Sequence, residues 1–341
     1  MFLSAFCLIL ACVFDMNSVI NGKSKIQNPK SKIAYVFPGQ GSQFVGMGKD
    51  FYENFSIARE VFNEADDALG FRLSKMCFAG TAEDLAQTEN TQPAILTVSI
   101  AAFRILESEG LPTPDFVAGH SLGEYSALVA AGAISFADAV KVVKMRGRFM
   151  QEAVPVGIGA MAAILGADLQ TVIESCAEAA GSHVCSAANM NAPMQTVIAG
   201  HAAAVDRAIE ILKSRGAKRA IKLNVSAPFH CALMQPAQEK LAAKIREIKF
   251  ENLRFPCVTN VETQPNGDGE RAKELLIRQV TTPVRWTQTV EFFNSVEVQT
   301  FIEVGAGKVL SGLIRQTLHE AILFNVEDSS SLVATKTALS T

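Results

Sequence analysis

The chain has 341 residues, which is long enough for a large domain and a smaller one with a substantial core. Its formal charge of −3, without a basic stripe or an acidic tail, argues against a nucleic-acid-binding protein. The seven cysteines are scattered without a Cys-x-x-Cys pair, and the five histidines lack metal-ligand spacing. The composition therefore indicates neither a disulfide scaffold nor a metal site, and it favours a reducing compartment.

The N-terminal segment does not match the rest of the chain. Residues 2–14 form an apolar run, but no Lys or Arg precedes it, and it is too short to span a bilayer. In the polar segment that follows, Lys-Ser-Lys-Ile occurs at both 23–26 and 30–33, which is typical of low-complexity sequence. We interpret residues 1–31 as an appendage outside the fold and not as a functional export signal, and we expect a cytoplasmic protein with no membrane association.

From residue 32 onward, short β-rich segments alternate with helical patterns, which is typical of α/β architecture. The first part predicts strands at 33–37 and 116–118 and helices at about 53–69, 81–90, 93–109, 122–131 and 135–151. A Pro/Gly-rich stretch at 155–159 then interrupts the pattern. Beyond it the sequence predicts strands at 160–165, 183–189, 196–200 and 218–223 and helices at 169–180 and 202–215.

The order of these later elements, βαββαβ, is typical of a ferredoxin-like unit. We therefore predict an α/β fold in which an α/β-hydrolase-like large domain carries an inserted ferredoxin-like small domain. The predicted large domain comprises residues 32–154 and 224–326, and the small domain comprises residues 155–223. The Ser/Thr-rich residues 327–341 are expected to form a frayed C-terminal tail.

The segment around Ser121 is the most informative part of the chain. It follows the apolar residues 116–118 and has the Gly-x-Ser-x-Gly pattern of a strand–turn–helix elbow. Gly119 and Gly123 are expected because such a tight turn crowds any Cβ atom at these positions. The pattern predicts Ser121 as a nucleophile, with the free N–H groups of the following helix facing a developing negative charge.

A serine hydroxyl needs a general base at neutral pH. His120 adjoins Ser121, but the elbow directs adjacent side chains apart, so a supporting role is the better interpretation of this residue. His230 follows a Pro-Phe break in a predicted loop, where reactive groups often lie. By spacing alone, a lone histidine in a loop is more often structural than catalytic. The neighbouring Cys231 is interpreted as an ordinary buried thiol.

Eight motifs occur in order along the chain: Phe37-Pro-Gly-Gln-Gly-Ser-Gln43, Thr91-Gln-Pro-Ala94, Gly119-His-Ser-Leu-Gly-Glu-Tyr-Ser-Ala127, Met145-Arg-Gly147, Asn189-Met-Asn191, Ala227-Pro-Phe-His-Cys231, Arg278-Gln279 and Glu303-Val-Gly305. This set resembles the malonyl-CoA:acyl carrier protein transacylases of fatty-acid synthesis and, more broadly, the acyltransferase domains of polyketide synthases. The resemblance runs from about residue 33 to residue 325, and eight co-linear motifs are far more specific than any one of them.

The resemblance implies the catalytic groups. Ser121 and His230 would form a Ser–His dyad, with the histidine oriented by a backbone carbonyl near Gln279 in place of an acidic triad member. The backbone N–H groups of Gln40 and Leu122 would form the oxyanion hole.

The resemblance also implies substrate-binding residues. Arg146, which would otherwise be interpreted as a solvated arginine, would grip the free carboxylate of a malonyl group, since a guanidinium matches that planar anion. Gln279 belongs to the same predicted binding set. Asn189 and Asn191 would bind polar groups of CoA or pantetheine, with a plain turn role as the alternative. Phe229 would crowd an α-methyl branch and so favour malonyl over methylmalonyl.

The implied reaction is ping-pong transfer of malonyl from malonyl-CoA to the pantetheine thiol of acyl carrier protein, through a malonyl-serine ester and without a metal or redox cofactor. The expected partners are malonyl-CoA and acyl carrier protein, and family members are usually monomers. Three alternatives stay open: the same transferase in a polyketide or glycolipid pathway, a serine hydrolase or thioesterase with an acidic triad member, and a catalytically idle module that binds carrier protein.

Overall fold

The computed structural model describes residues 32–223, 225 and 227–340. The predictions made for residues 1–31 lie outside this part of the chain. Within it, no helix is both long enough and apolar enough to cross a membrane.

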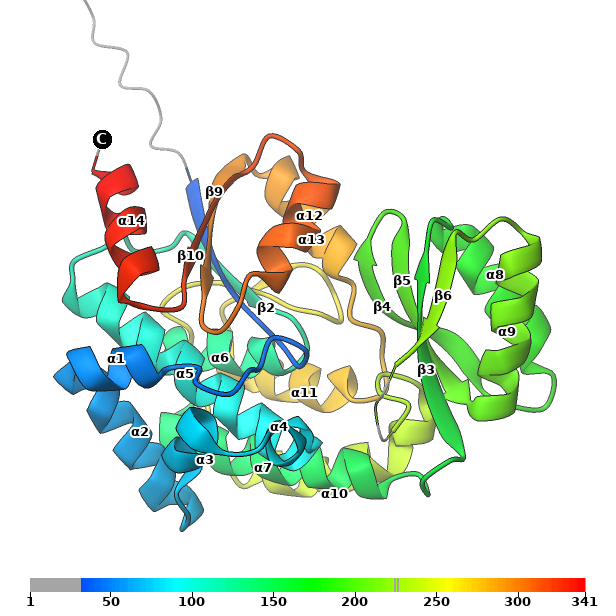
Figure 1. The fold of residues 1–341 in the computed structure, drawn as a ribbon, viewed down its shortest axis with the longest axis horizontal. Helices are drawn as coiled ribbons and strands as arrows, with labels where there is room; N and C mark the ends of the chain where they lie inside the picture. Colours follow the sequence, from blue (N-terminus) through cyan, green and yellow to red (C-terminus); the bar gives the residue numbers. More distant parts are fainter. Residues whose placement is uncertain (1–31, 224, 226, 341) are drawn as a thin grey trace, which may run out of the picture. The chain divides into compact units, whose positions relative to one another are not determined.

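A six-stranded sheet organises the larger part of the fold (Figure 1). Its strand order is β10-β9-β1-β2-β7-β8, and all neighbours are parallel except the β7–β8 pair. The strands are β1 (Lys32–Phe37), β2 (Phe116–Gly119), β7 (Cys257–Val258), β8 (Pro265–Asn266), β9 (Val298–Val304) and β10 (Ile322–Val326).

The central strand β1 is apolar on both faces, so both faces of the sheet must be covered. Tyr35 and Phe37 belong to the core cluster that contains α5 (Thr88–Ser108) and α6 (Leu122–Ala130). Ala34 and Val36 belong to a second cluster with α12 (Trp286–Ser295) and α13 (Val309–Thr317). The remaining helices of this part are α1 (Lys49–Asn54), α2 (Ser56–Leu69), α3 (Leu73–Ala79), α4 (Ala82–Ala86), α7 (Phe136–Glu152), α10 (Gln235–Arg246), α11 (Gly269–Gln279) and α14 (Ser329–Leu339), with a short 3₁₀ turn at Ala232–Met234.

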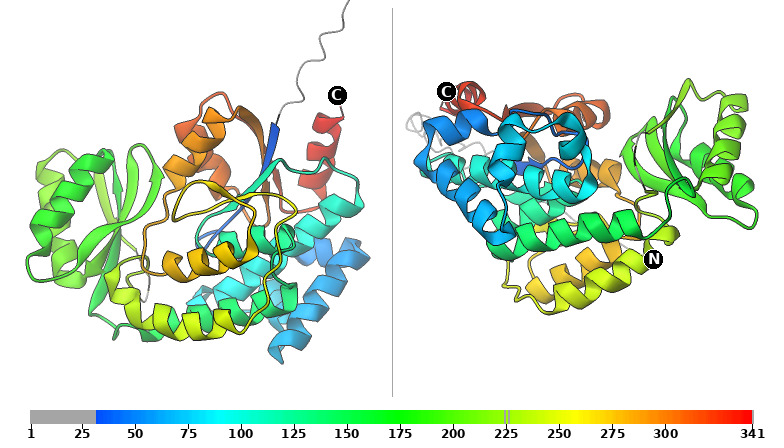
Figure 2. Two further views of the ribbon diagram at one scale, coloured as in Figure 1. Left: turned by 180° about the vertical axis from the view of Figure 1, so that it is seen from behind. Right: turned by 60° about the horizontal axis from the view of Figure 1, so that its bottom comes forward.

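A second, antiparallel sheet has the order β4-β5-β3-β6 (Figures 1 and 2). Its elements are β3 (Gly159–Leu165), α8 (Leu169–Ala180), β4 (Cys185–Ala192), β5 (Gln195–His201), α9 (Ala202–Ser214) and β6 (Arg219–Lys222). The two helices cover one face of the sheet around a third apolar cluster. The predicted α/β fold with a ferredoxin-like βαββαβ unit is therefore confirmed.

Backbone hydrogen bonds connect the antiparallel sheet to the segment between α11 and α12 of the larger part. The N–H of Val284, which precedes α12, donates to the carbonyl of Ala188 at 2.9 Å, and the N–H of Met190 donates to the carbonyl of Val284 at 2.8 Å. These bonds extend β4 toward the larger part of the fold, and they hold Asn189 at the boundary between the two parts.

Two predicted boundaries differ from the structure. The helices expected at 81–90 and 93–109 are instead the short α4 and the continuous α5, which contains Pro93. Pro93 removes one backbone hydrogen bond, but nearly all of α5 is buried, and this packing offsets the loss. The expected frayed tail at 327–341 is wrong for most of its length, because Ser329–Leu339 forms α14.

The helix α14 has a clear local cause. Asp328 caps its N-terminus and forms a capping box with Ser331, which satisfies backbone N–H groups that the helix itself leaves unpaired. Leu332 and Thr335 are buried, and the helix packs beside β10. The serines that suggested a frayed tail therefore cap this helix or lie in its first turn.

Candidate active site

The sharp turn between β2 and α6 presents Ser121. Its backbone has φ 51° and ψ −104°, a sparsely populated conformation for a residue with a side chain. A Cβ atom at Gly119 would lie 1.9 Å from the carbonyl carbon of Gly123, and a Cβ atom at Gly123 would lie 2.0 Å from the carbonyl oxygen of Phe37. The expectation that both glycines are required by crowding is confirmed.

The structure brings His230, and not His120, to the serine. His230 Nε2 lies 2.7 Å from Ser121 Oγ, whereas His120 Nε2 lies 2.8 Å from the side-chain oxygen of Asn191. His230 Nδ1 lies 2.9 Å from the backbone carbonyl of Gln279. Because a carbonyl can only accept, Nδ1 carries the proton, and Nε2 is left free to accept the serine proton.

Burial keeps His230 neutral. The side chain is 2 % exposed, and its removal from water, together with the positive charge of Arg146, lowers its pKa to about 3. An imidazole without a proton on Nε2 is the form that can act as a base, so the site is in the required protonation state at neutral pH.

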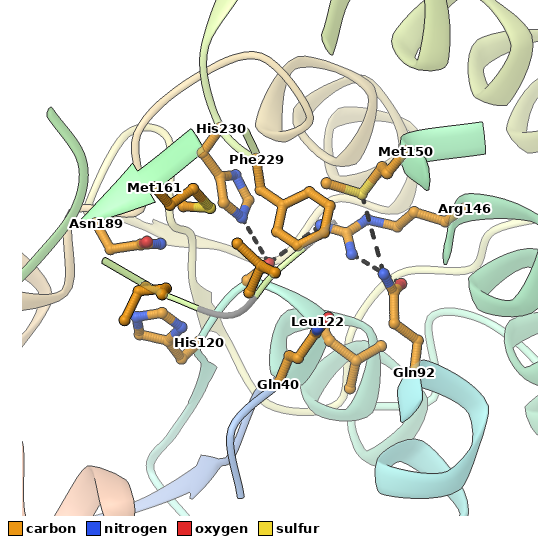
Figure 3. Close-up of a pocket in the computed structure, with 13 residues that line it drawn as sticks. Gln40, Gln92, His120, Leu122, Arg146, Met150, Met161, Asn189, Phe229 and His230 are labelled. Carbon is orange, nitrogen blue, oxygen red and sulfur yellow. Dashed lines mark hydrogen bonds between the residues drawn. The ribbon is translucent and has the colours of Figure 1, made fainter. Parts of the chain in front are cut away.

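Arg146 projects from α7 and directs its guanidinium at the same hydroxyl (Figure 3). Its Nη2 donates to Ser121 Oγ at 3.1 Å and to the side-chain oxygen of Gln279 at 2.9 Å, while Nη1 donates to Gln92 at 2.8 Å. The side chain is 1 % exposed and lies 5.5 Å from the ring centroid of Tyr125. The group is therefore a buried cation beside a nucleophile, and not the solvated arginine of the alternative interpretation.

The backbone N–H groups predicted for an oxyanion hole lie at the same place. Gln40 follows β1 in the glycine-rich loop, and Leu122 begins α6; both line the cavity around Ser121. Among the residues that the structure describes, neither N–H has a hydrogen-bond partner. Two free donors next to a nucleophile can stabilise a negative oxygen that forms during the reaction.

The cavity that contains Ser121 is lined by residues from the larger part of the fold and from the antiparallel insertion (Figure 3). The larger part of the fold contributes polar groups, and the residues from β3, β4 and the segment after β6 are mostly apolar. The lining residues are Gln40, Gln92, His120, Ser121, Leu122, Arg146, Met150, Met161, Asn189, Leu223, Val225, Phe229 and His230.

Two of the predicted substrate-binding residues do not line this cavity. Asn189 and Phe229 do line it, but Asn191 does not, and its Oδ1 accepts a hydrogen bond from His120 Nε2 at 2.8 Å. The side chain of Gln279 is fully buried and contacts Arg146 rather than the cavity. A register shift in β4 between Met190 and Ala192 interrupts the alternation that would otherwise place Asn191 on the same face as Asn189. Gln279 is the last residue of α11, and its side chain contacts Arg146.

Sequence reasoning missed Gln92, Glu124 and Asn260. The first two lie within the motifs Thr91-Gln-Pro-Ala94 and Gly119-His-Ser-Leu-Gly-Glu-Tyr-Ser-Ala127, so a signal was present without an assigned role. Asn260 lies in none of the motifs. Its Oδ1 accepts from the Ser121 N–H at 2.7 Å, and its Nδ2 donates to the Gly119 carbonyl at 2.7 Å, so it ties the two sides of the elbow together.

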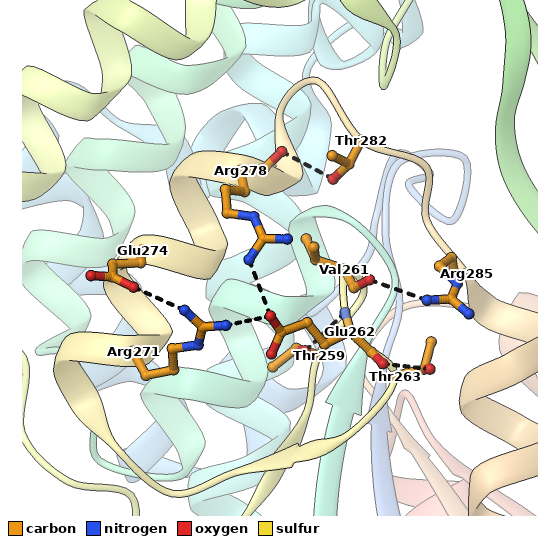
Figure 4. Close-up of polar contacts among 9 residues, drawn as sticks. All are labelled: Thr259, Val261, Glu262, Thr263, Arg271, Glu274, Arg278, Thr282 and Arg285. Atoms are coloured by element: carbon orange, nitrogen blue, oxygen red, sulfur yellow. Dashed lines mark hydrogen bonds and ion pairs between the residues drawn. The ribbon is translucent and has the colours of Figure 1, made fainter.

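Ion pairs connect the loop after β7, which contains Glu262, to α11 (Figure 4). Glu262 accepts from Arg278 at 3.1 Å and also from Arg271, both on α11. Arg285, in the segment that follows α11, donates to the carbonyl of Val261 at 3.4 Å. These contacts connect the loop after β7 to the helix that ends at Gln279. In the described part of the chain, no cluster of three or more His, Cys, Asp or Glu side chains is arranged to hold a metal ion.

The α/β fold with its antiparallel insertion, and a buried Ser–His pair beside an arginine, are consistent with an acyltransferase. The family described as the acyl transferase domain matches residues 34–336, and the chain belongs to this family.

The individual relatives are more specific. The chain is 48% identical to the malonyl CoA-acyl carrier protein transacylase of Escherichia coli (strain K12), over 89% of this chain and 98% of that protein. It is also 48% identical to the protein of the same name from Bacillus subtilis (strain 168), over 89% of this chain and 95% of that protein.

Two solved structures support the same placement. An acyl carrier protein S-malonyltransferase from Vibrio cholerae superimposes with a TM-score of 0.88 at 46% identity, covering 89% of this chain and all of that one. The malonyl-transacylase in a complex with its type II PKS acyl-carrier protein superimposes with a TM-score of 0.87 at 45% identity, covering 89% of this chain and 98% of that one.

Proposed function

We propose that this protein transfers the malonyl group of malonyl-CoA to the pantetheine thiol of acyl carrier protein in fatty-acid synthesis. The observation that carries the proposal is the 3.1 Å contact between Arg146 Nη2 and Ser121 Oγ. A buried cation this close to the nucleophile suits an acyl group that ends in a carboxylate.

In the first half-reaction, His230 Nε2 takes the proton of Ser121 as Oγ attacks the thioester carbonyl. The negative oxygen of the tetrahedral intermediate is stabilised by the N–H groups of Gln40 and Leu122. The carbon–sulfur bond then breaks, and the proton on His230 passes to the departing CoA thiolate. The malonyl carboxylate takes the place of Ser121 Oγ on Arg146, which leaves Oγ as the ester oxygen.

In the second half-reaction, His230 takes the proton of the pantetheine thiol, and the sulfur attacks the malonyl-serine ester. The ester carbon–oxygen bond breaks, and the proton returns to Ser121. The backbone carbonyl of Gln279 keeps the imidazole in one tautomer throughout, so that the same nitrogen serves in both directions.

The hydrolase or thioesterase alternative has less support. It requires an acidic residue at His230 Nδ1, and this position is occupied by the Gln279 carbonyl. A polyketide role for the same transferase is favoured by one observation, the 45% identity to a malonyl-transacylase bound to a PKS carrier protein. The expectations of a monomer that acts in the cytoplasm without a cofactor remain predictions.

The test is the intact mass of the protein after incubation with malonyl-CoA, acetyl-CoA or methylmalonyl-CoA, for the wild type, Ser121→Ala and Arg146→Ala. We expect a malonyl adduct on the wild type, no adduct on Ser121→Ala, and a shift from malonyl to acetyl on Arg146→Ala, by at least about 100-fold in relative rate. An adduct that survives Ser121→Ala, or no adduct from any of the three esters, contradicts the proposal.

A further inference from the structure

Two charged groups are buried together beneath the site. Arg146 on α7 and Glu124 on α6 are each 1 % exposed. The guanidinium donates hydrogen bonds to two neutral amides and a hydroxyl, those of Gln92, Gln279 and Ser121. Burial of a lone guanidinium is strongly unfavourable unless an opposite charge lies nearby, and the Glu124 carboxylate is the counter-charge in this cluster.

Gln279 connects the two charges. Its side-chain nitrogen donates to Glu124 Oε2 at 2.8 Å and to the Ser121 carbonyl at 3.0 Å, and its side-chain oxygen accepts from Arg146 at 2.9 Å. Since both partners of the nitrogen are acceptors, the amide has one satisfied orientation, with its oxygen facing the guanidinium. Glu124, together with the Ser121 carbonyl, thus orients the amide of Gln279 so that its oxygen faces Arg146. The backbone N–H of Asn260 donates to the same carboxylate oxygen at 3.0 Å and fixes its position.

We propose that Glu124, acting through Gln279, balances the charge of Arg146 in the empty site and so limits how tightly the malonyl carboxylate is bound. When that carboxylate enters, a second negative charge approaches a cation that is already balanced. Repulsion between the two carboxylates weakens binding, which helps the product to leave. This inference makes Glu124 a positioning and affinity-setting residue, and it rests on the proposed malonyl transfer.

The pKa of Glu124 reflects both its burial and its polar neighbours. Burial raises the pKa of Glu124 to about 7, while its hydrogen bonds to Gln279 and Asn260 and the charge of Arg146 lower it. Burial also lowers the pKa of Arg146, and the charge of Glu124 is among the effects that oppose this. Above pH 7 the carboxylate is therefore mostly ionised, and at pH 6 it is mostly protonated.

The other titratable groups around Glu124 keep their state over this range. Burial raises the pKa of Tyr125 to about 12 and that of Cys257 well above its usual value, and His230 has a pKa of about 3. Burial also lowers the pKa of His120, beside Ser121, below its ordinary value. Glu124 is therefore the acidic group of this cluster whose pKa lies within the range from pH 6 to pH 8.

The test compares Glu124→Gln with Glu124→Asp at pH 8. Glutamine can accept the same hydrogen bonds without the charge, whereas aspartate keeps the charge on a shorter side chain. Glu303→Gln is the matched control, because Glu303 is fully buried and accepts N–H groups of α13, outside the cavity. The measurement is the rate of acyl-serine formation against the concentration of malonyl-CoA or acetyl-CoA, which separates apparent affinity from limiting rate.

We expect Glu124→Gln to bind malonyl-CoA about 10-fold more tightly while its apparent affinity for acetyl-CoA changes less than about 2-fold. Glu124→Asp and Glu303→Gln should match the wild type in the ratio of the two affinities. An unchanged affinity for malonyl-CoA, or equal shifts for both esters, overturns the inference. If Glu124→Gln does not fold, the wild type decides: its affinity for malonyl-CoA relative to acetyl-CoA should rise from pH 8 to pH 6, and a constant ratio overturns the inference.

The outcomes also separate this inference from the proposed function. A wild-type protein that forms no malonyl-serine overturns both. Normal acylation of the wild type, together with a Glu124→Gln variant that has the same affinities, overturns the inference alone.

Discussion

At the scale of single residues, burial determines the protonation state of the His230 imidazole. His230 lies between the backbone carbonyl of Gln279 and the hydroxyl of Ser121, with the Arg146 guanidinium on the same hydroxyl. A cation and an apolar environment both disfavour a second positive charge, so the imidazole stays neutral well below its usual titration range. The same arrangement that suits a base also makes the folded state sensitive to acid.

The first prediction concerns this acid sensitivity. His230 has a pKa of about 3 in the folded protein, below its value of about 6.5 in the unfolded chain, so the unfolded state takes up the proton first. Its contribution to stability is complete above about pH 6.5 and is lost as the pH falls toward 3. The free energy of unfolding of the wild type should therefore fall, relative to that of His230→Asn, between pH 6.5 and pH 4.5.

Urea denaturation of both proteins across this range measures the difference. Glu124 has a raised pKa, so its effect is to increase the free energy of unfolding as the pH falls over part of this range. Because Glu124 is present in both proteins, this effect cancels in the comparison. Parallel pH dependences for the two proteins would contradict the burial of an unprotonated imidazole.

At the scale of elements, the elbow depends on a segment from elsewhere in the chain. The strained backbone of Ser121 stores about 1–3 kcal/mol, which the surrounding structure must offset. Asn260, in the segment after β7, bonds to both sides of the turn, and Glu262 fastens this segment to α11. The position of the nucleophile is therefore set by a contact between β2, α6 and the segment after β7.

The second prediction concerns Asn260. Replacement by alanine leaves the Ser121 N–H and the Gly119 carbonyl without their partner, which should lower the free energy of unfolding by about 2 kcal/mol. Because the elbow relaxes, the rate of acyl-serine formation from malonyl-CoA should fall by at least about 10-fold. Asn266→Ala on β8 is the control, since its side chain bonds only within its own turn at Asp268. Equal acylation rates for Asn260→Ala and Asn266→Ala would show that the elbow keeps its conformation without the hydrogen bonds of the Asn260 side chain.

At the scale of the whole molecule, the cavity is lined by both parts of the fold. The larger part supplies the reacting groups, and the antiparallel insertion supplies Met161, Asn189 and Leu223 to the opposite wall. The backbone bonds between Val284 and β4 join the two parts at this point. The residues that line the cavity lie between Gln40 and His230.

The third prediction concerns the N-terminal segment. Since β1 begins at Lys32 and the site residues follow it, we expect a chain without residues 1–31 to fold and to form malonyl-serine at a rate within about 2-fold of the full-length rate. Thermal unfolding and intact-mass acylation of the two proteins measure this. A shortened chain with a large loss of either property would show that the segment is part of the functional protein and not an appendage.

The α/β order of elements, the βαββαβ unit and the elbow could be predicted from the sequence, because periodicity, turn residues and glycine crowding act over a few neighbouring positions. Arg146 and His230 were indicated only through resemblance, since a lone arginine or histidine has no local signature. The packing of the folded chain brings His230 to Ser121. It also decides that Asn260, 139 residues away, holds the serine backbone, and that Glu124 and Gln279 meet across 155 residues. Such long-range contacts depend on how helices and strands pack against one another. The helix α14 shows that capping and packing can also order a segment whose composition suggests disorder.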